Sequence, residues 1–304
     1  MNCPACGQPS APRLHALLDA TSGQRFDLLG CSKCGHGVTA PVPQDLAAVY
    51  AADYHGTRHG FTARLCWKRR LGRIAAAAAT ARRMLDIGCG DGSLLQLAQQ
   101  RGMEVAGTEF SVEAARSKGL DVRRELRDFV GTAPFDVITS WHSLEHMTDP
   151  VAVLRDAHAL LHPQGTLLLA VPDARCWSAL LFGRHWLHLD APRHLHHFSS
   201  RSIEHMLRAA GYQPVHRFGG EAEYDLMGWS QSLLDALGLP RQAFFKMLTG
   251  KSQQGLVARA VHGALGAAAT ALVFVPWLLS ITLRSPGTLV VAARRGASAQ
   301  HGAS

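Results

Sequence analysis

The sequence predicts an α/β fold built on a mostly parallel sheet with helices on both faces. Two observations lead to this prediction. From Arg82 onward, short apolar runs alternate with segments of helical pattern, at a spacing typical of strand–helix–strand units. The first of these runs then ends in a glycine-rich loop within residues 85–94, LDIGCGDGSL. Ligands of such sheets bind beyond the carboxyl ends of the strands, which is where this loop falls.

The elements follow in order along the chain. We expect strands at 84–87, 104–108, 121–124, 135–140 and 166–171. Helices are expected at 93–101, 111–118, 150–161 and 200–211. Two further strands are expected at 212–218 and 287–294, so the C-terminal part of the chain returns to the sheet.

Positive charge is concentrated in two regions of the 304-residue chain, whose formal net charge is +8. No acid occurs between Asp53 and Asp86 or after Asp235, although both stretches are rich in Arg and Lys. We read residues 41–81 as a linker and a basic helical segment, helical from Phe61 to about Arg83. Such regional charge favours contact with phosphate, lipid headgroups or nucleic acid, or else a solvated helix face.

Four of the seven cysteines form two C-x-x-C-G motifs, Cys3 with Cys6 and Cys31 with Cys34. Each motif makes a tight turn that directs two thiolates to one point, so the pair predicts a structural Zn²⁺ site in a ribbon over residues 1–40. A redox C-x-x-C pair or unliganded thiols are the alternatives. The polar start MNCPACG lacks an apolar signal-peptide core, which favours a cytoplasmic location.

The glycine-rich loop discriminates between ligands by its spacing. Gly88, Gly90 and Gly92 follow G-x-G-x-G, whereas a nicotinamide fingerprint is G-x-G-x-x-G. Asp86, two residues before the first glycine, suits a cationic ligand and would repel a pyrophosphate. S-adenosylmethionine carries an ammonium and a sulfonium group and no phosphate. Glu109, after the second strand, could accept hydrogen bonds from ribose hydroxyls, although a dinucleotide site would want the same acid. A loop that serves only the chain path is the alternative.

The segments MLDIGCGDGSLL, GTEFS, FDVITSWHSLEHMTDP and LHPQGTLLLAVPD together resemble the core of class I S-adenosylmethionine-dependent methyltransferases. The ribbon, PVPQDLAAVYAADYHG and WLHLDAPRHLHHFS resemble a bacterial group with an N-terminal zinc ribbon that modifies sugars, polysaccharides or lipid-linked glycans. The resemblance covers about residues 1–220. It implies a Rossmann-like sheet whose last strand is antiparallel, with the methyltransferase core over residues 82–220.

The resemblance also implies a set of cofactor-binding residues. The loop residues Asp86, Gly88, Cys89, Gly90 and Gly92 would surround the methionine and ribose parts of S-adenosylmethionine, with Glu109 on the ribose. The adenine would lie beside Glu125 and Leu126, and the methyl group near Ser140, Trp141 and His142.

Five histidines lie between residues 185 and 197, in the connection after the fifth strand. Because a poorly acidic hydroxyl benefits from a general base, we expect His194 to act as that base, with His197 as the second choice. The alternatives are histidines that only shape the pocket wall, or a metal cluster of His194, His196 and His197, whose spacing does not direct three imidazoles to one centre. Glu145 and His146 are read as structural residues of a turn.

A hydrophobic helical insertion is expected over residues 221–284. Residues 260–283 contain no Asp, Glu, Lys or Arg, and this uncharged stretch is long enough for a membrane span. However, Pro276 interrupts the stretch, and residues 285–295 read as the last strand of the core, so a single crossing is excluded. The insertion then covers the active site, docks on anionic lipid, or is a core or dimer helix. Residues 296–304 are expected to form a disordered tail.

The sequence therefore predicts an S-adenosylmethionine-dependent methyltransferase that acts on oxygen, or carbon, of a sugar, glycan or lipid-linked saccharide. We expect it in the cytoplasm, and peripheral on the inner membrane face if residues 260–283 dock on lipid. One alternative is a methyltransferase for a non-sugar small molecule. Another is a zinc-ribbon nucleic-acid-binding protein with a nucleotide-sensing domain, disfavoured because the ribbon is not basic and aromatic residues rarely alternate with bases. A nicotinamide oxidoreductase is disfavoured by the glycine spacing.

Overall fold

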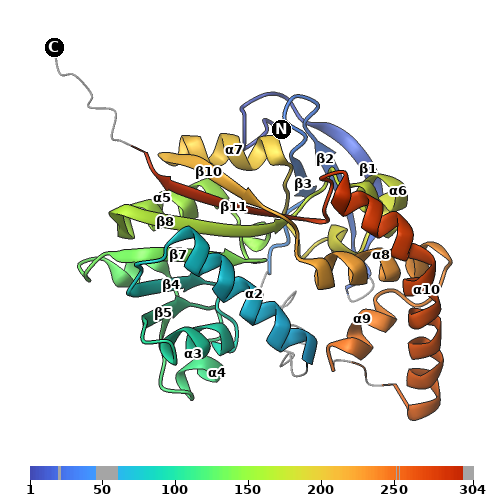
Figure 1. The fold of residues 1–304 in the computed structure, drawn as a ribbon. Helices are drawn as coiled ribbons and strands as arrows, with labels where there is room; N and C mark the ends of the chain where they lie inside the picture. The colour runs from blue at the N-terminus through green and yellow to red at the C-terminus, as the bar shows by residue number, and fades with distance from the viewer. Residues whose placement is uncertain (20–21, 46–60, 251, 253, 297–304) are drawn as a thin grey trace.

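The structure is a computed structural model that describes residues 1–19, 22–45, 61–250, 252 and 254–296 (Figure 1). Residues 46–60, most of the expected linker, lie outside the described residues. The expected C-terminal tail does too, except for Gly296.

A seven-stranded sheet forms the centre of the chain, in the order β10-β11-β8-β7-β4-β5-β6. The pairs within β6-β5-β4-β7-β8 are parallel, and β11 is antiparallel to both of its neighbours. This order and the antiparallel strand confirm the Rossmann-like methyltransferase sheet expected from the sequence. The strands are β4 (Arg83–Ile87), β5 (Glu104–Thr108), β6 (Asp121–Arg123), β7 (Phe135–Trp141), β8 (Leu161–Pro172), β10 (Tyr212–Phe218) and β11 (Thr288–Arg295).

Helices cover both faces of the sheet and bury two apolar clusters against it (Figure 1). On one face lie α2 (Phe61–Ala77), α3 (Ser93–Gln99) and α4 (Glu113–Arg116); on the other lie α5 (Pro150–Leu160) and α7 (Ser200–Ala209). Successive residues of β7 divide between the clusters, with Val137 in one and Ile138 in the other. Because both faces are covered, the strands read as continuous apolar runs in the sequence.

The N-terminal ribbon is a second sheet that takes one strand from the core. Its order is β1-β2-β3-β9, with β1 (Ala11–Leu18), β2 (Arg25–Gly30), β3 (Gly37–Ala40) and the two-residue β9 (His196–His197). The Thr39 hydroxyl donates to the His194 carbonyl at 2.7 Å and lies 2.9 Å from His197 Nε2. Ser199 caps α7 and donates its hydroxyl to the Cys34 carbonyl at 2.5 Å. The ribbon is therefore joined to the chain around His194.

Several bases of helix α2 form ion pairs with carboxylates inside the protein. Arg70 and Arg73 are buried, and Arg70 makes two 2.9 Å hydrogen bonds to the carboxylate of Glu221, while Arg69 pairs with Glu223. Only part of the helix, including Arg64 and Lys68, faces solvent. Part of the positive charge for which an anionic partner was expected thus pairs with Glu221 and Glu223 and holds α2 against the start of the insertion.

The insertion is helical, as expected, and consists of α8 (Ala222–Ala236), α9 (Ala243–Leu248) and α10 (Leu256–Thr282). Helix α10 runs for 27 residues through Pro276 and packs against α8 and α9 at the edge of the molecule (Figure 1). It is long and apolar enough to cross a membrane by length and composition, yet only 22% of its most apolar 18-residue window is buried. Because β11 returns directly to the sheet beside β10, the insertion begins and ends at neighbouring strands. The reading of α10 as a core helix is wrong, since most of it is exposed.

Candidate active site

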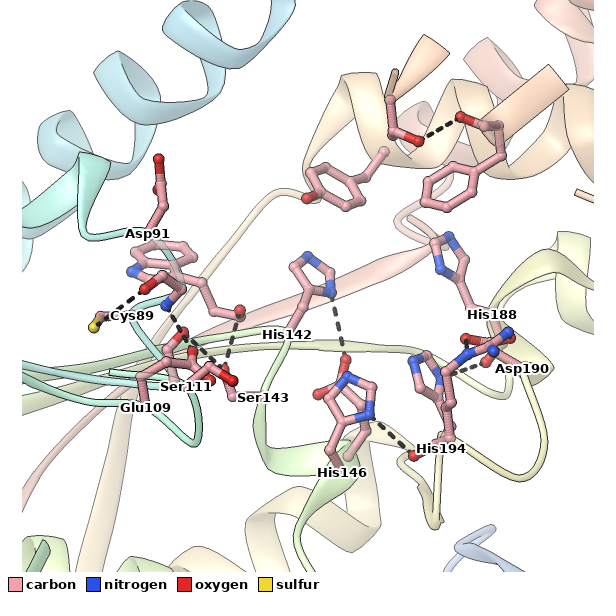
Figure 2. Close-up of a pocket in the computed structure, with 18 of the residues that line it drawn as sticks. Cys89, Asp91, Glu109, Ser111, His142, Ser143, His146, His188, Asp190 and His194 are labelled. Carbon is pink, nitrogen blue, oxygen red and sulfur yellow. Dashed lines mark hydrogen bonds and ion pairs between the residues drawn. The ribbon is translucent and has the colours of Figure 1, made fainter. Parts of the chain in front are cut away.

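A cavity of about 580 Å³ opens at the carboxyl ends of the parallel strands. Figure 2 shows its two ends: Cys89, Asp91, Glu109 and Ser111 on one side, and a group of histidines on the other. The glycine loop and the ends of β5 and β7 form the first end. The second end is formed by the turn after β7, the chain from Leu187 to His194 and the insertion. Two molecules that react with each other could therefore lie in one continuous cavity.

The glycine loop has a backbone that L-residues with side chains rarely adopt. Gly88 has φ +70°, and a Cβ there would approach the Ser143 hydroxyl to 2.2 Å. Gly90 has φ +59°, and a Cβ there would meet no atom within 4 Å because it would point into open space. The first glycine thus permits close packing against the turn after β7, and the second leaves room beside the loop for a ligand.

Glu109 lies where β5 ends and is nearly buried. One carboxylate oxygen accepts the Gly90 N–H at 2.8 Å, and the other accepts the Phe110 N–H at the same distance. Each carboxylate oxygen can accept a further bond. Glu109 therefore stays available to two ribose hydroxyls while it orients the glycine loop.

Asp86 lies below the loop, outside the lining of the cavity. Its carboxylate accepts a 2.5 Å hydrogen bond from the Thr139 hydroxyl on β7. Burial raises the pKa of Asp86 to about 7, against the Thr139 hydrogen bond and the charge of Arg70, which lower it. Asp86 would therefore influence a cationic ligand through the electrostatic field of its carboxylate, without direct contact.

His142, directly after β7, joins the floor of the cavity to a buried carboxylate. It has φ +54°, its Nε2 lies 2.7 Å from Glu221, and its ring stacks on Tyr224 at 4.6 Å. Burial by itself lowers the pKa of His142, but Glu145 and Glu221 outweigh it, so the pKa is raised. His142 is thus held as part of an ion network with Glu221 and Arg70.

His146, His188, His194 and Glu145 line the second end of the cavity. The rings of His146 and His194 lie 4.8 Å apart there (Figure 2). His146 Nδ1 lies 3.0 Å from the Arg193 carbonyl, and His194 Nδ1 lies 2.8 Å from the His188 carbonyl. Burial and the neighbouring His146 lower the pKa of His194 to about 4, and burial lowers that of His188 to about 3. Glu145 is 1% exposed; burial alone would raise its pKa, but the facing imidazoles lower it to about 2. Glu145 and His146 do lie in a turn, as expected, but both also line the cavity, so they are more than structural residues of that turn.

Six of the residues expected at the site lie outside the cavity lining. Besides Asp86, they include Gly92, which caps the start of α3 and packs against Leu120. The Glu125 side chain points outward, caps the short helix 126–129 and pairs with Arg127, while Leu126 is part of the core. Ser140 is buried in the sheet, outside the cavity lining. His197 is 3% exposed and contacts Thr39 of the ribbon, because β9 places it in the ribbon sheet opposite Gly37. The structure therefore corrects the expectation that these residues border the ligands.

Several lining residues were not found from the sequence. Trp67 and Arg70 come from α2. The Arg70 guanidinium lies 4.8 Å from the ring of Trp141, a residue that was expected at the site. The insertion contributes Tyr224, Gln242, Phe245, Lys246 and Thr249. The alternative in which the insertion covers the active site is the one that this geometry supports.

The four ribbon cysteines meet at one point. Cys3 Sγ lies 3.5 Å from Cys34 Sγ, and Cys6 Sγ lies 3.6 Å from Cys31 Sγ. All four sulfur atoms lie within 4.8 Å of one another, and none forms a disulfide. Four thiolates about 2.3 Å from a central Zn²⁺ would stand at similar separations, so the donor set fits that ion.

Comparison with known proteins agrees with this geometry. Residues 58–217, more than half of the chain, match the model of a methyltransferase domain. The chain belongs to the class I S-adenosylmethionine-dependent methyltransferases. Two curated relatives of this methyltransferase are each named ubiquinone biosynthesis O-methyltransferase. One, from Cereibacter sphaeroides, is 29% identical over 170 residues, or 50% of this chain and 68% of the relative. The other, from Xanthomonas campestris pv. campestris, is 29% identical over 144 residues, or 42% of this chain and 60% of the relative.

A solved structure supports the fold alone. Phospholethanolamine N-methyltransferase 2 of Haemonchus contortus, in complex with phosphomonomethylethanolamine and S-adenosylhomocysteine, superposes with a TM-score of 0.51 at 15% identity. The match covers 76% of the present chain and 53% of the Haemonchus contortus enzyme. Within the cavity, the open side of Gly90 and the carboxylate of Glu109 fit the ribose of S-adenosylmethionine, because they offer space and paired acceptors at one place.

Replacing Glu109 tests the cofactor end. In Glu109→Gln one acceptor oxygen becomes a donor and the charge is lost, so we expect S-adenosylmethionine to bind roughly 10- to 100-fold more weakly, as for other charged hydrogen bonds. Isothermal titration calorimetry measures this change. Glu104→Gln, at the exposed other end of β5, is the matched control and should bind as the wild type does. Equal affinities of the two variants would contradict the assignment.

Replacing Asp86 tests the buried carboxylate through pH. With a pKa of about 7 in the folded chain and an ordinary value near 3.8 when unfolded, folded Asp86 holds more protons between pH 4 and 7. The free energy of unfolding should therefore fall as pH rises through this range, by at most about 1.4 kcal/mol per pH unit from this group. In Asp86→Asn that contribution disappears, so the variant should show a flatter pH dependence in urea denaturation. An unchanged slope would show that Asp86 is ionised throughout.

Proposed function

We propose that the enzyme transfers the methyl group of S-adenosylmethionine to a hydroxyl oxygen of a small polar acceptor. The observation that carries this proposal is the continuity of the cavity from Gly90 and Glu109 to the histidines. The relatives' name, O-methyltransferase, supports oxygen over carbon as the acceptor atom. A polar wall supports a hydroxylated acceptor: Asp190 accepts from Arg193 Nε and from Gln242 Nε2, each at 2.8 Å.

S-adenosylmethionine supplies an electrophilic methyl group on a sulfonium centre. The chain's own part is to place the acceptor in line with that group and to take up the hydroxyl proton. His194 can do the second, because its Nδ1–H is directed to the His188 carbonyl and leaves Nε2 with the lone pair. The low pKa of its ring keeps it neutral near pH 7. His142, the insertion and Arg70 close the cavity around the reacting groups.

The sugar, glycan or lipid-linked saccharide expected from the sequence is kept as the finer proposal. It is favoured by the same polar wall of Asp190, Arg193 and Gln242, whose groups could bond to several hydroxyls. The relatives' name points to a different acceptor, so the substrate class has to be found by experiment. The nucleic-acid alternative is weakened because Arg69, Arg70 and Arg73 of the basic helix are engaged within the chain.

We also propose that the ribbon holds a structural Zn²⁺ through Cys3, Cys6, Cys31 and Cys34. Its support is the convergence of the four sulfur atoms within 4.8 Å. A site closed by four thiolates would contribute to folding rather than to catalysis. Because the ribbon sheet includes β9, this contribution would extend to the chain that carries His194.

Replacing His194 tests the acceptor end. We expect His194→Ala to bind S-adenosylmethionine normally, because the residue lies at the other end of the cavity, and to lose turnover by roughly 100-fold or more. Calorimetry gives the affinity, and transfer of a labelled methyl group to small molecules of a cell extract gives the turnover. His205→Ala, exposed on α7, is the control. Binding of NAD in place of S-adenosylmethionine would sink the functional proposal, and turnover kept within a few-fold would remove His194.

We further propose that α10 docks on an anionic lipid surface at the cytoplasmic face of a membrane. Its exposed residues include Leu272 (72% exposed) and Val275 (61%), and the exposed bases Arg259 and Arg284 lie near its two ends. An apolar helix surface with flanking bases is typical of interfacial binding. Since α8 and α9 pack on α10 and line the cavity, docking would bring the cavity close to the membrane.

Vesicle binding tests the docking proposal. Wild-type protein should sediment with vesicles that contain phosphatidylglycerol, and the double variant Leu272→Glu, Val275→Glu should remain in the supernatant. Leu237→Glu, equally exposed at the end of α8, is the matched control and should bind as the wild type does. If the wild-type protein does not sediment and instead forms a dimer that the double variant disrupts, α10 is a dimer helix.

A further inference from the structure

Three metal-ligating side chains converge at the acceptor end of the cavity. Glu145 and His146 lie in the short helix Leu144–His146 after β7, and His194 lies 48 residues further along the chain, in the connection that leads to β9. One ligand atom from each of the three lies within 4.8 Å of the others. This arrangement differs from the cluster of His194, His196 and His197 considered from the sequence, because β9 carries the last two into the ribbon sheet.

Glu145 is a buried carboxylate with unused acceptor capacity. It is 1% exposed, and neither oxygen accepts a hydrogen bond among the described residues. His142 Nδ1 is 3.6 Å from Oε1, beyond hydrogen-bond length, and the same ring makes its short 2.7 Å contact with Glu221. Asp190, the other acid at this end, is already paired with Arg193. His142 offsets part of this buried charge from 3.6 Å, and a cation held between Glu145 and the two other imidazoles would offset the remainder.

The two histidines are oriented as metal ligands usually are. His146 Nδ1 faces the Arg193 carbonyl at 3.0 Å, and His194 Nδ1 faces the His188 carbonyl at 2.8 Å. A carbonyl can only accept, so each Nδ1 carries the proton and each neutral ring keeps its lone pair on Nε2. Backbone carbonyls that fix the tautomer in this way are the common outer partners of metal-bound histidines.

We propose that Glu145, His146 and His194 hold a divalent transition-metal cation that binds the acceptor hydroxyl. Two imidazoles and one carboxylate form a set that binds Zn²⁺ or similar ions and leaves positions open for a substrate. This inference rests on the proposed O-methylation and deepens it. A hydroxyl bound to the cation loses its proton to water more readily; its oxygen then bonds to the methyl carbon as the carbon–sulfur bond breaks and sulfur keeps the electron pair. His194 then acts as a ligand in place of a free base.

Cobalt titration of the full-length protein tests this site. The protein is purified with zinc in the ribbon and dialysed, and Co²⁺ is added while visible absorption is recorded. We expect one further equivalent to bind, with the weak bands of a nitrogen and oxygen ligand set and without the strong thiolate bands that a cobalt-substituted ribbon would give. Glu145→Gln should weaken this binding roughly 100-fold or more, and His146→Gln is a second variant in case the first does not fold. His205→Ala should bind Co²⁺ as the wild type does.

The outcomes separate this inference from the proposed function. Absence of the additional cobalt bands, or equal cobalt affinity in Glu145→Gln and the wild type, overturns the metal site. If methyl transfer also persists after chelator treatment that leaves the ribbon zinc in place, and is lost in His194→Ala, then His194 is a free base and the proposed function stands. If calorimetry detects no binding of S-adenosylmethionine, the proposed function fails, whatever the cobalt result.

Discussion

The buried carboxylate of Glu221 is the interaction on which the arrangement of the site depends. It is fully buried and accepts two hydrogen bonds from Arg70 of α2, with His142 of the β7 end at 2.7 Å and Arg73 at 3.8 Å. Burial by itself raises the pKa of Glu221, but these neighbours hold it well below its usual range. Three segments far apart in the sequence are thereby fixed at one point. A buried charge that lost one partner would be strongly destabilising, so the network allows little freedom in how these segments meet.

The insertion forms part of the wall of the active-site cavity. Glu221 begins it, Tyr224 stacks on His142, and Phe245 and Lys246 of α9 line the cavity. Helix α10 then presents its apolar residues outward. The cavity thus lies between the carboxyl ends of the parallel strands and the inserted helices. Specificity for the acceptor would therefore reside largely in α8 and α9.

The sheet could be predicted from the sequence because its signals are local. Glu104–Thr108 and Tyr212–Phe218 have the expected bounds, and the glycine spacing placed the cofactor loop without any long-range information. Contacts between distant segments leave no such local signal. The sequence around Arg70 does not indicate that its guanidinium pairs with the carboxylate of Glu221. Local ambiguity explains the other errors. His194 and His197 are three residues apart, and only the pairing of β9 with β3 decides which one faces the cavity. Glu145 was read as a structural turn residue because the LEH stretch resembles one that shapes such a turn. It does lie in a turn, but its place in the cavity lining is visible only in three dimensions.

The fourth strand of the ribbon sheet has a consequence for how the chain must be made. Strand β3 pairs with β9, and His36 Nε2 lies 3.1 Å from Nδ1 of His196, 160 positions further along the chain. During synthesis the first 40 residues leave the ribosome long before their partner does, with the edge of β3 open. Unpaired strand edges recruit other strands. The ribbon strands therefore emerge before the core but are completed only after β9 has been made, and a fragment that ends before residue 196 would carry an exposed edge.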